Sequence, residues 1–181
     1  MRIDSKVLLF GSALIALAPF ALAKTASLTV PTVPNGLRLP DGLKLERTFN
    51  ADGVQIYACQ AKADNAGFEW AFKAPEATLS AEDGTKTGTH YAGPTWEAND
   101  GSKLVGEVKA RLNSSDQNAI PWLLLATKSI GKDGLLSKVV FIHRLETVGG
   151  KAPSSECNTG TVGTQARVPY TAKYYFYAAQ N

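Results

Sequence analysis

The amino-acid sequence predicts an all-β fold, an antiparallel β-sandwich or squat barrel of about eight or nine strands with one disulfide. Three observations lead to this prediction: repeated hairpin-turn dipeptides, apolar residues that alternate with a period of two, and the near absence of amphipathic helical patterns. The chain has 181 residues, of which 44% are apolar and 19% charged. Those values are typical of an ordinary folded domain.

The dipeptide Asp-Gly divides the chain into short segments, because it tolerates positive φ and is a strong hairpin signal. It occurs five times, at residues 41–42, 52–53, 83–84, 100–101 and 133–134. The segments with a period of two that we expect to be strands are 43–49, 54–59, 68–73, 102–110, 139–145 and 170–177. Segment 122–125, Trp-Leu-Leu-Leu, is apolar on both faces and predicts a buried central strand.

Residues 1–23 have the features of a secretory signal peptide: early cations, an apolar run, and alanines at Ala21 and Ala23 before the expected cleavage site. The run is shorter than the roughly 20 residues that cross a bilayer. We therefore expect an exported protein, periplasmic or extracellular, with no integral membrane segment after signal removal. The remaining chain divides into an extended Pro-rich N-terminal arm, 24–42, and a single β-domain, 43–181.

The charge pattern argues against binding to nucleic acid. The formal net charge of +3 falls to +2 when two cations and one anion leave with the signal peptide. The remaining Lys and Arg residues are scattered along the chain, so no basic patch is expected.

The chain has two cysteines, Cys59 and Cys157, and an oxidising destination, which favours a disulfide between them. The alternatives are a nucleophilic thiol or half of a metal site. A metal site would need His90, His143 and a carboxylate such as Glu97 or Glu146 to meet in the fold. We expect no metal and no cofactor.

The block from His90 to Glu97 is the most distinctive part of the sequence and has two interpretations. In the first, residues 93–94 make a bend, Trp96 packs in the core, and His90 and Tyr91 bond to backbone groups. In the second, His90, Tyr91, Trp96 and Glu97 line a groove in which an aromatic ring meets an apolar or sugar face. The sequence leaves both open.

The most distinctive segments of the chain are 54–59, 90–97, 100–102, 120–125, 147–150 and 170–177. Together they resemble an uncharacterised family of exported bacterial and fungal proteins, called domain of unknown function 3455. The likeness extends over roughly residues 35–178. It implies export and one compact domain, with no established activity and no catalytic residues.

Some fungal members of that family are labelled malate dehydrogenase. This sequence does not support that activity. A dinucleotide site needs Gly-x-Gly-x-x-Gly at a strand-to-helix turn. That spacing does not occur in the chain. Nor does the sequence contain the Gly-x-Ser-x-Gly or His-Glu-x-x-His motifs of hydrolases.

The leading hypothesis is an exported, non-enzymatic β-domain that binds a small molecule, a glycan or a protein through the His90–Trp96 region. No catalytic residue is predicted. One alternative is an envelope or extracellular carbohydrate-active enzyme acting through His90, Glu97 or Asp100, since two carboxylates at suitable separation can hydrolyse glycosides. A third hypothesis is a structural envelope protein.

Overall fold

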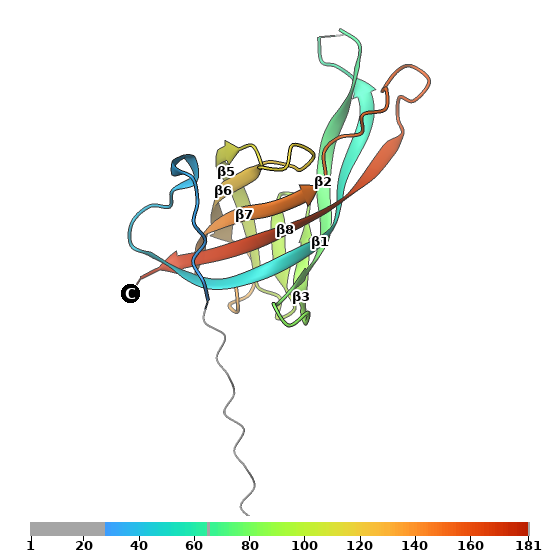
Figure 1. Ribbon diagram of the computed structural model, residues 1–181. Helices are drawn as coiled ribbons and strands as arrows, with labels where there is room; N and C mark the ends of the chain where they lie inside the picture. The colour runs from blue at the N-terminus through green and yellow to red at the C-terminus, as the bar shows by residue number, and fades with distance from the viewer. Residues whose placement is uncertain (1–27, 65, 181) are drawn as a thin grey trace, which may run out of the picture.

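The protein folds as a ring of eight antiparallel strands, seen in a computed structural model that describes residues 28–64 and 66–180 (Figure 1). Each strand pairs with its neighbours in the chain, and the first strand pairs with the last. The strands are β1 Leu43–Ala61, β2 Phe68–Ser80, β3 Lys86–Tyr91, β4 Thr95–Ala98, β5 Lys103–Leu112, β6 Trp122–Ser129, β7 Val139–Gly149 and β8 Gln165–Ala179. The predicted all-β fold is confirmed, with the closed barrel as the form that it takes.

The barrel is much taller on one side than on the other. β1 has 19 residues and pairs with both β2 and β8, whereas β4 has four. The far ends of β1 and β2 therefore project beyond the ring, beside the connection between β7 and β8 (Figure 1). The Asp-Gly dipeptide at 52–53 was expected to form a turn that ends a strand. Asp52 and Gly53 instead lie inside β1 and pair with both neighbouring strands.

A disulfide joins the projecting part of β1 to the connection that precedes β8. Cys59 and Cys157 are bonded, with a Cα–Cα distance of 5.4 Å and a sequence separation of 98. The predicted pairing is thus confirmed. Closing a loop of this length stabilises the fold by about 4–5 kcal/mol in the chain-entropy account.

The interior of the barrel is filled by alternate residues of every strand, as the period of two requires. These residues include Phe49, Ala51, Ala77, Leu79, Trp96, Ala98, Leu104, Leu123, Leu125, Ile142, Tyr170, Ala172, Tyr174 and Phe176. Phe49 and Phe176, on the two strands that close the ring, pack edge to face with ring centroids 5.1 Å apart. The core therefore spans the line of closure.

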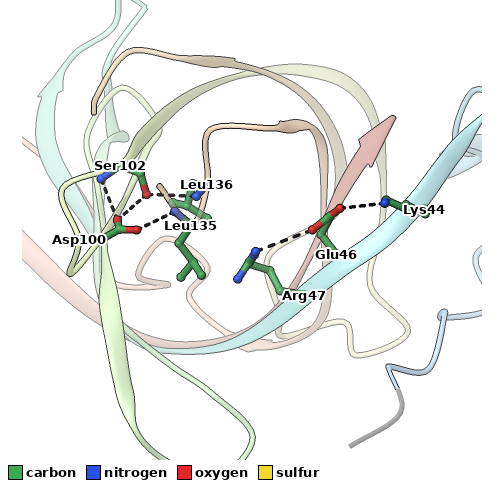
Figure 2. A network of polar contacts seen from close by, with 7 residues as sticks. All are labelled: Lys44, Glu46, Arg47, Asp100, Ser102, Leu135 and Leu136. Carbon is green, nitrogen blue, oxygen red and sulfur yellow. Dashed lines mark hydrogen bonds and ion pairs between the residues drawn. The ribbon is translucent and has the colours of Figure 1, made fainter. Parts of the chain in front are cut away.

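One end of the barrel is closed by the connection between β6 and β7, which inserts Leu136 fully buried into the core. Asp100 holds this connection: its Oδ1 accepts hydrogen bonds from Ser102 N and Oγ at 2.9 and 2.6 Å, and its Oδ2 accepts one from Leu135 N at 2.6 Å (Figure 2). Ser102 Oγ in turn accepts from Leu136 N at 3.1 Å. These bonds lower the pKa of Asp100 to about 2, with the Ser102 hydroxyl as the largest cause.

The outer face of β6, β7 and β8 is covered by the segment that precedes β1. Leu37, in the short 3-10 helix Asn35–Leu37, is fully buried against Leu124, Leu145, Tyr175 and Tyr177. His143 Nε2 donates to the Leu37 carbonyl at 2.7 Å, and its Nδ1 accepts from the Tyr177 hydroxyl at 3.1 Å. Strand β6 is therefore buried on both faces, as its Leu run predicted.

Within residues 28–64 and 66–180, no helical segment reaches the length and apolar character that crossing a bilayer requires. The predicted signal peptide, residues 1–23, lies outside the described part of the chain.

We expect Leu37→Ala to lower the free energy of unfolding by about 2–5 kcal/mol, because it empties a fully buried site beneath the covering segment. Chemical denaturation measures the change. The matched control is Leu135→Ala, at a residue 38% exposed, which should cost no more than about 1 kcal/mol. An equally small loss at Leu37 would show that the segment contributes nothing to the core.

Candidate functional site

The end of the barrel opposite Leu136 contains a cavity of about 580 Å³ that opens to solvent. Its walls come from all eight strands, from the turn between β3 and β4, and from the connection between β5 and β6. The lining residues are Gln55, Tyr57, Trp70, Phe72, Lys73, Pro75, His90, Gly93, Pro94, Trp96, Val108, Arg111, Ile120, Pro121, Leu123, Leu125, Arg144 and Tyr174.

An aromatic wall rises on the tall side of the cavity, where β1 and β2 extend past the ring. The rings of Tyr57 and Phe72 meet edge to face, with centroids 5.7 Å apart. Tyr57 donates a hydrogen bond to the Gly150 carbonyl at 2.7 Å, and Trp70 Nε1 donates to the Ser155 carbonyl at 2.9 Å. The connection between β7 and β8 therefore supports this wall from behind.

His90 and Trp96 form part of the inner wall, and both side chains are almost fully buried. Their rings stack with centroids 4.4 Å apart, and His90 Nδ1 donates to the Thr95 carbonyl at 2.8 Å. Burial lowers the pKa of His90 to about 3, so the imidazole is neutral at physiological pH. Gly106 makes room for the indole, since a Cβ there would lie 2.7 Å from Trp96 Cζ3.

Tyr91 and Glu97, the other two residues predicted to line a groove, lie on the outer face of the barrel. Each adjoins an inward-pointing neighbour in a strand, so the period of two turns it outward. The Tyr91 hydroxyl donates to Glu97 at 2.7 Å, and Lys103 pairs with the same carboxylate at 3.1 Å. The structure thus brings His90 together with Trp96, and Tyr91 with Glu97, but does not bring the two pairs together.

The carboxylates considered for glycoside hydrolysis are both held in their ionised form. The hydrogen bond from Tyr91 and the contact with Lys103 lower the pKa of Glu97, and the turn hydrogen bonds lower that of Asp100. A glycosidase needs one carboxyl with a raised pKa to protonate the leaving group. Neither side chain has that property.

The two histidines lie on opposite faces of the sheet, His90 inside the barrel and His143 on the outer face under Leu37. Both cysteines are bonded to each other. Across the described residues, no group of three or more His, Cys, Asp or Glu side chains is placed to hold a metal ion.

A family model described as a protein of unknown function, DUF3455, matches residues 40–178. The chain belongs to this family. No curated protein and no solved structure matches it. The resemblance inferred from the sequence is therefore confirmed, and the match covers all of β1 to β7 and all but the last residue of β8 in the DUF3455 barrel.

Four polar residues of this DUF3455 cavity region were not predicted as site residues: Gln55, Arg144, Tyr170 and Tyr174. All four lie at inward positions of long strands, among apolar neighbours. In the sequence, these sites could have been found as charged or amide residues at strand positions where the period of two otherwise places apolar residues. It was not decisive, because β7 and β8 are apolar on both faces and the sequence does not say which face is interior.

We expect His90→Ala to cost about 1–3 kcal/mol of stability, since it leaves the buried Thr95 carbonyl without its donor and removes the ring stacked on Trp96. That loss is several degrees in Tm for a domain of this size. Glu97→Ala is the matched control: its carboxylate is partly exposed and its ion pair is at the surface, so the cost should stay below about 1 kcal/mol. A larger loss of stability in Glu97→Ala than in His90→Ala would contradict the placement of both residues.

Stability should fall as the pH is lowered from about 6.5 towards 5. The unfolded chain binds a proton at His90 in this range, whereas the folded protein, with the His90 pKa near 3, does not. His90 alone contributes a slope of up to about 1.4 kcal/mol per pH unit, and His143 adds in the same direction because burial lowers its pKa too. Denaturation at several pH values should show a smaller slope in His90→Gln, and an unchanged slope would refute the buried neutral imidazole.

Proposed function

We propose that this DUF3455 chain is an exported, non-enzymatic domain that binds a small molecule with an apolar body in the barrel cavity. The observation that carries the proposal is the cavity itself, about 580 Å³ in volume and open at one end of an otherwise closed and well-packed barrel. Pockets that bind small molecules in proteins have volumes of this order, roughly 300–1,000 Å³.

The character of the walls supports an apolar ligand. Tyr57, Trp70 and Phe72 supply aromatic surface, and further walls are aliphatic. Phe72 and Val108 are 52% and 42% exposed although both are large and apolar. Apolar side chains exposed together around a hollow mark binding sites, and contact with a ligand would remove these two from water.

The chemistry of the site supports binding rather than catalysis. The only imidazole on the described cavity walls, that of His90, is neutral, and its Nδ1 is occupied by the Thr95 carbonyl. Among the described lining residues there is no carboxylate that could act as a general base. The site has no activated nucleophile of the kind that acyl or glycosyl transfer requires.

Export is supported by two independent features. Residues 1–23 have the charge, apolar core and small cleavage-site residues of a signal peptide. The Cys59–Cys157 disulfide suits an oxidising compartment such as the periplasm or the medium.

We expect the purified protein to bind the neutral fluorescent probe N-phenyl-1-naphthylamine saturably, one molecule per chain, with increased emission. Val108→Trp should weaken binding at least about tenfold, because the larger ring fills the cavity beside β5. The matched control is Val148→Trp, at a valine that is 58% exposed and does not line the cavity, which should bind as the wild type does.

Absence of saturable binding would refute the proposal. Equal binding by the wild type and Val108→Trp would place the probe elsewhere on the surface and would equally overturn it.

A further inference from the structure

We propose that the cavity selects an acidic ligand, a small apolar molecule whose single carboxylate binds the guanidinium of Arg144. This inference rests on the proposed function and specifies the chemical class of its ligand. It is carried by the charges of the cavity lining, by the fixed position of Arg144, and by unpaired hydrogen-bond donors around it.

The described lining of the cavity carries positive charge only. Lys73, Arg111 and Arg144 are cations, and no Asp or Glu is among the lining residues. Ion pairs occur elsewhere on the protein, as in Lys103 with Glu97 and Arg167 with Glu76. A hollow with one sign of charge and apolar walls concentrates the opposite charge at its mouth.

Arg144 lies on the inward face of β7, and its orientation is fixed by the backbone. Its Nε and Nη2 both donate to the Pro121 carbonyl, at 3.2 and 2.8 Å. Among the described residues, no carboxylate pairs with the guanidinium, and the Tyr174 hydroxyl is a neutral polar group close to it. A half-buried charge without a counter-ion is unfavourable, so a carboxylate in the cavity would satisfy it.

The positive charge of Arg144 shifts the pKa values of aromatic side chains in the cavity region. Burial raises the pKa values of Tyr57, Tyr170 and Tyr174, and the charge of Arg144 opposes each rise. The same charge adds to the lowering that burial causes in the pKa of His90. The guanidinium therefore lies among these rings, inside the barrel.

Three buried donors in the cavity region make no hydrogen bond of normal geometry in the described structure: Gln55 Nε2, Tyr170 OH and Tyr174 OH. Tyr170 lies close enough to Gln55 and Tyr174 for their side chains to shift its pKa, and the Tyr174 hydroxyl lies close to the Arg144 guanidinium. Their residues are between 0 and 2% exposed. Gln55 and Tyr174 line the cavity, and Tyr170 lies on the same face of β8 as Tyr174. A buried donor without a partner is unfavourable, and a ligand that accepts hydrogen bonds would satisfy it.

A carboxylate suits this set of groups better than a phosphate does. It has two oxygens with about four lone pairs, which match the free edge of one guanidinium and a few neutral donors. The only further cations at the cavity, Lys73 and Arg111, are exposed. The half-buried positive charge of Arg144 compensates one negative charge, and a second negative charge in the cavity would remain unpaired.

The test compares 2-naphthoic acid with 2-naphthamide, which share the ring system and differ in charge, by calorimetry at neutral pH. The wild type should bind the acid at least about tenfold more tightly than the amide, in the range expected for hydrogen bonds to charged groups. Arg144→Gln should remove this preference by weakening the acid while leaving the amide unchanged. Arg167→Gln removes the same charge outside the cavity and should preserve the preference.

Equal affinities for acid and amide in the wild type would overturn the inference, as would a preference that survives in Arg144→Gln. If N-phenyl-1-naphthylamine and the amide bind well and the acid no better, only the acidic ligand is refuted. If none of the three binds, the proposed function itself fails. If Arg144→Gln does not fold, the affinities of the wild type for acid and amide still show whether the cavity prefers an acidic ligand. Arg144→Lys then tests whether the planar guanidinium is needed, because the charge is retained.

Discussion

The pairing of β1 with β8 is the contact on which the rest of the structure depends. It converts a meander of eight strands into a closed ring, so that every strand has a neighbour on both sides and sends alternate residues to one interior. The ring is uneven because β1 has 19 residues while β4 has four. Strands of such different length cannot form a barrel of constant height, and the opening results from that mismatch.

One end of the barrel is closed and the other is open. At one end, Leu136 enters the core and Asp100 fixes the connection that carries it. At the other end, β1 and β2 extend past the shorter strands on the far side of the ring. Inward side chains there, such as Tyr57, line a cavity instead of filling it.

The polar groups inside the barrel follow a consistent pattern. His90 is neutral and hydrogen-bonded to Thr95, so it behaves as part of the packed wall. Among the described residues, Gln55 and Tyr174 instead have buried donors without a hydrogen-bond partner, and Arg144 bonds only to a backbone carbonyl by its Nε and Nη2, all at the cavity. Groups that lower the stability of the empty protein are usually retained for function, and these three have in common that they can donate hydrogen bonds.

The period of two, the hairpin turns and the two cysteines were enough to predict an all-β fold and the Cys59–Cys157 disulfide, because both depend on local alternation and on cysteine count. The family was recognisable from short motifs. The site was not: alternation separates the two faces of a strand but does not say which is inside, so His90 and Glu97 were grouped although they point apart. Only ring closure, and the covering of the outer face by Leu37, decided that Arg144 points into the cavity.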